Sequence, residues 1–106
     1  MFNRVFALLV VICTGFFLAA CSSHYVAVQG ASPETVFNDA CAGCHHPLPA
    51  SSDKYFSLSD DERNAGYIAG RILHGGVMMP AFPHIEGEQL AALSHFVLEH
   101  SVEKTK

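Results

Sequence analysis

The chain has 106 residues and a formal net charge of −4, and half of its residues are hydrophobic. This length suits one small domain. The acidic balance argues against nucleic acid and anionic lipid surfaces as binding partners, and it favours partner proteins that present a basic docking patch.

The first apolar segment, residues 5–20, follows Arg4 and contains no charged residue. Its length of roughly 15 residues is short for a membrane-spanning helix, which needs about 20. A short positive region, an apolar region and then small residues are typical of a secretory signal peptide. A short transmembrane anchor is the alternative interpretation.

The end of this segment, Leu18-Ala19-Ala20-Cys21, is similar to the lipobox of bacterial lipoproteins. The resemblance implies that residues 1–20 are removed and that the sulfur of Cys21 carries a lipid. The mature chain would then lie on the periplasmic side of a bacterial membrane, and Ser22 after the cysteine favours the outer membrane. An ordinary signal peptide with an unmodified Cys21 is the alternative.

Residues 21–31 have little periodic pattern and are expected to form the lipidated cysteine and a flexible tether. Ten extended residues would reach about 33 Å. A domain is expected over residues 32–106. Its first helix is predicted from Ser32 as N-cap, Pro33 at the first helical position and an apolar stripe that runs through Cys44 over roughly three turns.

The second helix is predicted to begin at a capping box formed by Ser59 and Glu62 and to end at Gly75-Gly76. Residues 46–57 and 77–85 contain prolines and no clear period, which indicates loops. A last amphipathic helix begins near residues 86–88. No segment predicts a strand, so the expected fold is all-α, with about three helices.

The motif Cys41-Ala42-Gly43-Cys44-His45 is the central chemical feature. Two thiols at this spacing, followed by histidine, are typical of c-type haem attachment, in which each sulfur forms a thioether and the histidine ligates the iron. A redox dithiol would require a βαβ pattern, and a structural zinc site would require a second ligand pair. The sequence contains neither, and we expect one covalent haem c.

The second axial ligand is expected in the loop that contains Met78-Met79-Pro80, where Met79 lies 34 residues after His45. A thioether is a soft donor that favours ferrous iron and raises the reduction potential. His74, at the end of the preceding helix, is an alternative ligand. His46, His84, His95 and His100 are expected at the surface.

The chain resembles class I cytochrome c in three features. These are the motif with Cys41, Cys44 and His45, the Met79-Pro80-Ala81-Phe82 segment, and the closing helix. The resemblance implies a small helical domain wrapped around one haem, with Met79 rather than its rival Met78 as the distal ligand. It also implies a contact between the first and last helices. The residues expected in that contact are Phe37, Leu93 and Phe96.

The resemblance also concerns the surroundings of the haem. A prolyl carbonyl of the loop after His45, at Pro47 or Pro49, is expected to accept a hydrogen bond from the His45 Nδ1. The residues expected to line the haem pocket are Tyr55, Phe56, Tyr67, Ile68 and Phe82. Packing in the core is an equally adequate interpretation of them.

The function expected from this sequence is one-electron transfer in a respiratory chain by a membrane-anchored carrier that is not itself an enzyme. An iron with both axial positions filled has no vacant site for a substrate. Two alternatives stay open: a haem-carrying subunit of a larger oxidoreductase complex, and a gas-binding or sensory haem module.

Overall fold

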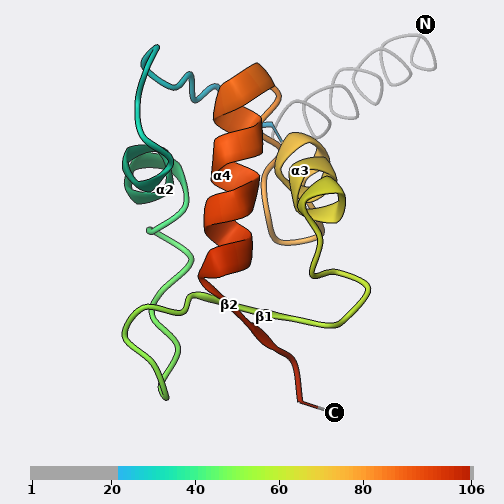
Figure 1. Cartoon of the computed structure of the whole chain (residues 1–106). Coiled ribbons are helices and arrows are strands. Elements are labelled where there is room, and N and C mark those ends of the chain that lie inside the picture. Colours follow the sequence, from blue (N-terminus) through green and yellow to red (C-terminus); the bar gives the residue numbers. More distant parts are fainter. Residues whose placement is uncertain (1–21, 106) are drawn as a thin grey trace, which may run out of the picture.

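The computed structural model describes residues 22–105 (Figure 1). Within these residues three helices and two short strands occur, and no helix is long and apolar enough to cross a membrane. The elements are α2 (Pro33–Ala40), β1 (Phe56–Leu58), α3 (Ala65–His74), α4 (Gly87–Glu99) and β2 (Ser101–Glu103). The predicted signal peptide, residues 1–20, and the predicted lipidation site Cys21 lie outside the described residues.

Helix α2 begins where the sequence predicts and ends earlier. The Ser32 hydroxyl accepts a hydrogen bond from the backbone N–H of Thr35 at 3.2 Å, and Pro33 occupies the first turn. The helix ends at Ala40, so the Cys41–His45 motif forms a tight turn beyond it. In this turn the N–H groups of Cys44 and His45 both bond to the Cys41 carbonyl, at 3.1 and 2.9 Å.

Helix α3 begins later than predicted, at Ala65. The capping-box contact exists, since the Ser59 N–H donates to Glu62 at 3.1 Å, but it closes only a turn. Asn64 is the N-cap instead, and its side-chain oxygen accepts from the Tyr67 N–H at 2.8 Å. Asn is as good an N-cap as Ser, and here it lies next to the apolar stripe. The end of the helix at Gly75 is as predicted.

Helix α4 lies between α2 and α3 and packs against both (Figure 1). Each helix contributes buried apolar side chains, and the loop before α4 adds two more. The core residues from these elements are Val36, Phe37, Ile68, Ile72, Phe82, Ile85, Leu93 and Val97. Burial of these side chains supplies the main favourable free energy of folding.

The prediction that the domain contains no strand was wrong. Strands β1 and β2 form a parallel pair, with Phe56 opposite Ser101 and Leu58 opposite Glu103. The pair continues at its end, where the Lys104 N–H donates to the Leu58 carbonyl at 2.8 Å. With three residues each, these strands are too short for an alternating apolar pattern to be recognised in the sequence.

The segment 22–31, expected as a flexible tether, lies against the domain. Ser22 forms a bridge with Ala81, and the Ser23 N–H donates to the Ala81 carbonyl at 2.7 Å. Ala27 is buried in the core. The reach expected for an extended tether therefore does not apply to this segment.

Candidate functional site

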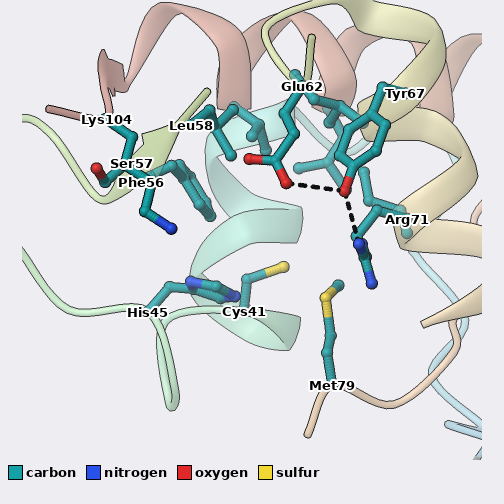
Figure 2. Close-up of a pocket in the computed structure, with 14 residues that line it drawn as sticks. Cys41, His45, Phe56, Ser57, Leu58, Glu62, Tyr67, Arg71, Met79 and Lys104 are labelled. Atoms are coloured by element: carbon teal, nitrogen blue, oxygen red, sulfur yellow. Dashed lines mark hydrogen bonds between the residues drawn. The ribbon is translucent and has the colours of Figure 1, made fainter. Parts of the chain in front are cut away.

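Two adjoining cavities mark the candidate site. The larger, of about 320 Å³, lies among α3, α4 and the β1–β2 pair; the smaller, of about 230 Å³, lies beside the loop before α4. Three residues line both: Cys41, His45 and Met79. Both predicted axial ligands, His45 and Met79, and the predicted attachment residue Cys41 therefore line both cavities, and Figure 2 shows them around the larger one.

The turn after α2 presents Cys41 and His45 to the larger cavity. The His45 ring packs against Phe56, with ring centroids 4.8 Å apart. Partial burial lowers the pKa of His45, and the neighbouring His46 lowers it further. The neutral imidazole, which is the form that binds a metal ion, is therefore favoured.

The two cysteines of the motif, Cys41 and Cys44, are free thiols and differ in exposure. Burial raises the pKa of the Cys41 thiol to about 11, and Cys44 adds to this rise. Cys41 is therefore protonated at neutral pH, and a thiol is a far weaker nucleophile than a thiolate. Cys44 is exposed, and it lines the smaller cavity.

Met79 reaches the site because its loop folds back on the end of α3. The Gly76 N–H donates to the Met79 carbonyl at 2.9 Å. Gly75 has a positive φ of 71°, and a Cβ there would lie 2.6 Å from the Met79 carbonyl oxygen, so glycine is required. Met79 is half-buried and lines both cavities, whereas Met78 is 95% exposed and lines only the smaller one.

A polar chain crosses the wall of the larger cavity. The Tyr67 hydroxyl donates to Glu62 at 3.1 Å and accepts from the Arg71 guanidinium at 2.6 Å. Figure 2 shows these three side chains across the cavity from Cys41. Glu62 and Arg71 were not predicted as site residues, although Tyr67 and Arg71 are four residues apart and so share one helix face.

The remaining wall of the larger cavity is mostly apolar, and it is suited to a flat apolar macrocycle. Its apolar residues are Phe56, Leu58, Ile68, Ile72, Leu93 and Val97. Together with sulfur and imidazole donors, which are the ligands that haem iron takes in cytochromes c, these residues fit a haem.

The comparison with known families agrees with this chemistry. The family model described as "Cytochrome C oxidase, cbb3-type, subunit III" matches residues 28–97. The chain belongs to this family. It is therefore a small c-type cytochrome, and membership implies a covalently bound haem c and a haem-based electron-transfer function. No curated protein and no solved structure matches the chain.

Most of the pocket residues expected for this cytochrome lie where predicted. Phe56, Tyr67 and Ile68 line the larger cavity, and Phe82 lines the smaller. Tyr55 lines neither; its ring packs against Phe37, with centroids 4.8 Å apart.

The expected hydrogen bond from His45 to a prolyl carbonyl does not occur within residues 22–105. The His45 ring contacts Phe56 instead, in the wall of the larger cavity. The adjacent Leu48 N–H bonds to the Lys54 carbonyl at 2.7 Å, which folds this loop on itself.

The other histidines of the cytochrome domain are mostly exposed, as expected. These are His46, His84 and His95. His74, the alternative ligand, is also exposed and lines neither cavity. His100 differs from the prediction, because its ring stacks on Phe96 with centroids 4.0 Å apart and its Nδ1 lies 2.8 Å from the Phe96 carbonyl oxygen.

The expected contact between the first and last helices of the domain is confirmed. The rings of Phe37 and Phe96 lie with centroids 5.2 Å apart, and Leu93 is completely buried. This contact joins α2, which leads into the Cys41–His45 motif, to α4 at the centre of the fold.

Proposed function

We propose that this cytochrome carries one haem c, bound through thioethers to Cys41 and Cys44, with His45 and Met79 as the axial ligands, and that it transfers single electrons. The observation that carries the proposal is the shared wall of the two cavities, where Cys41, His45 and Met79 meet. When bound, the haem supplies an iron that changes its charge by one electron.

The chain's own residues account for the proposed role as a carrier. His45 has its pKa lowered and so offers a neutral nitrogen. Met79 offers a thioether from a loop held to the end of α3, which favours the ferrous form and raises the potential. With both ligands bound, no position is open for a substrate, so an electron carrier is favoured over a gas-binding module.

Replacing Met79 with alanine tests this ligand assignment. We expect the near-infrared charge-transfer band of the thioether–iron bond to disappear from the oxidised holoprotein and carbon monoxide to bind the reduced form readily. Met78→Ala is the matched control and should keep both wild-type properties, because Met78 is almost fully exposed. A lost band in Met78→Ala alone would reassign the ligand, and a wild-type protein that binds carbon monoxide would favour a gas-binding module.

A second candidate function is that of a haem subunit in a larger oxidoreductase complex. The description of the matched family favours it, since it names a subunit of an oxidase. Purification from gently solubilised membranes separates the two roles. A shuttle is recovered alone, whereas a subunit is recovered in fixed proportion with the other chains of its complex. In either role, the net charge of −4 favours a redox partner with a basic docking patch.

We further propose that Cys21 carries a lipid and anchors the domain on the periplasmic side of a membrane, with the outer membrane favoured by Ser22. Cys21 is bonded to Ser22, which pairs with Ala81 in the loop that follows Met79. Consecutive Cα atoms are about 3.8 Å apart. A lipid at Cys21 would therefore hold the domain against the bilayer surface rather than at the end of a long tether.

Mass spectrometry of the protein from membranes tests the anchor. We expect the mature chain to begin at Cys21 and to carry the added mass of a diacylglycerol. Cys21→Ser should lose this mass entirely, whereas Cys13→Ser should keep it, since Cys13 belongs to the predicted signal peptide. An unmodified Cys21 thiol in the wild-type protein would contradict the proposal.

A further inference from the structure

The wall of the larger cavity carries charged groups whose role the proposed electron transfer does not explain. Three charged residues line this cavity: Glu62, Arg71 and Lys104. Arg71 and Lys104 are exposed as well as lining the cavity, so water solvates their charge and a ligand inside the cavity can still reach it. Such groups would recognise a ligand that carries negative charge.

Glu62 is already compensated within the protein. Its carboxylate accepts hydrogen bonds from the Ser59 N–H at 3.1 Å and the Tyr67 hydroxyl at 3.1 Å. These bonds lower the pKa of Glu62, so the group is an anion at neutral pH. A carboxylate repels an anionic ligand. Arg71 and Lys104 are therefore the charged groups of this cavity that would attract one.

The two cations stand on opposite sides of the cavity. Figure 2 shows the Arg71 guanidinium beside Met79 and the Lys104 ammonium on the side of His45. Arg71 donates one hydrogen bond, to Tyr67 at 2.6 Å, and the hydrogen bonds of residues 22–105 include none from the Lys104 ammonium. Both therefore keep donors for an anionic ligand, since an ammonium has three and a guanidinium five.

Strand β2 is what brings Lys104 to the cavity. Its pairing with β1 sets Glu103 opposite Leu58, and the Lys104 N–H donates to the Leu58 carbonyl at 2.8 Å. The family match ends at residue 97, so this strand and this lysine lie beyond it. The family model therefore does not account for Lys104.

We propose that Lys104 and Arg71 each bind one propionate carboxylate of the haem, which makes strand β2 part of the cofactor site. This inference rests on the proposed attachment to Cys41 and Cys44. A haem carries its two vinyl groups on one half of the macrocycle and its two propionates on the other. Thioethers formed from the vinyl groups at the cysteines direct both carboxylates away from Cys41. The two cations flank the cavity, so each can reach one carboxylate. Charge-assisted hydrogen bonds of this kind are the strong ones.

Resonance Raman spectroscopy of the purified holoprotein tests this contact through the propionate bending modes. A hydrogen bond stiffens the bend, so Lys104→Gln and Arg71→Gln should each shift a propionate mode to lower frequency. Lys104→Arg should restore it, because a guanidinium also binds a carboxylate. Arg63→Gln removes an exposed positive charge that lines neither cavity and should leave the modes unchanged.

The outcomes separate the two proposals. If Lys104→Gln binds haem covalently and keeps the wild-type propionate frequencies, the proposed role of Lys104 is wrong. An equal frequency shift in Arg63→Gln would show that the shift is a general effect of charge and would also contradict the proposed contact. Absence of covalent haem in the wild-type protein would instead overturn the proposed function. Circular dichroism checks that each variant is folded, and Lys104 is exposed, so its substitution leaves the core intact.

Discussion

Replacing both Cys41 and Cys44 with serine is expected to abolish covalent haem binding. A serine hydroxyl does not form the stable thioether that a cysteine sulfur makes with a vinyl group. His45 and Met79 remain in this variant, so any haem would be held by ligation and packing alone. After denaturing gel electrophoresis, haem staining should be lost completely from the double variant and retained at full strength in the wild-type protein.

The single variants and a control complete this experiment. Cys41→Ser and Cys44→Ser should each keep haem through one thioether, and the absorption band of the pyridine adduct should move to longer wavelength because one vinyl group stays conjugated. Cys13→Ser makes the same change outside the Cys41–His45 motif and should stain like wild type. Haem that survives denaturation in the double variant would show that attachment occurs elsewhere.

The helical framework could be predicted because its signals are local. Pro33 after Ser32 marks the beginning of α2, and Gly75 with its positive φ marks the end of α3. The beginning of α3 was misplaced because two polar residues compete as N-cap. Ser59 satisfies the pattern of a capping box, and Asn64, next to the apolar stripe, is the one that the helix uses.

The strands and the docked N-terminal segment could not be predicted because their contacts are distant in sequence. Phe56 pairs with Ser101, and Ser22 pairs with Ala81. Three-residue strands and a single bridge leave no periodic pattern, since pairing is decided by where the helices bring the chain. The stacking of His100 on Phe96 could not be predicted for the same reason, because it follows from a turn at the end of α4.

The candidate site likewise contains residues that could be predicted from the sequence and residues that could not. The attachment motif and Met79 are recognisable because chemistry demands those residue types at a fixed spacing or beside a proline. The charged residues that line the larger cavity have no such pattern. Arg71 lies in the last turn of α3, where a cation is common, and Lys104 reaches the cavity only through the β1–β2 pairing.

Replacing Phe37 with alanine is expected to lower the free energy of unfolding by about 3–5 kcal/mol, the usual cost of removing a buried phenylalanine. Phe37 is 2% exposed, and its ring lies 4.8 Å from Tyr55, 5.9 Å from Phe56 and 5.2 Å from Phe96. A small domain has a total stability of about 5–15 kcal/mol, so the loss is large. Denaturant unfolding of the oxidised holoprotein measures it.

Two further variants show whether this cost comes from the contact between α2 and α4. Phe37→Leu keeps apolar volume but no aromatic ring and should lose less than Phe37→Ala. Val28→Ala shortens a side chain that is 75% exposed and should change stability by no more than about 0.5 kcal/mol. A loss below about 1 kcal/mol in Phe37→Ala would be typical of a surface site rather than a core one. It would mean that the haem, rather than the aromatic contact with Phe96, holds the Cys41–His45 turn against α4.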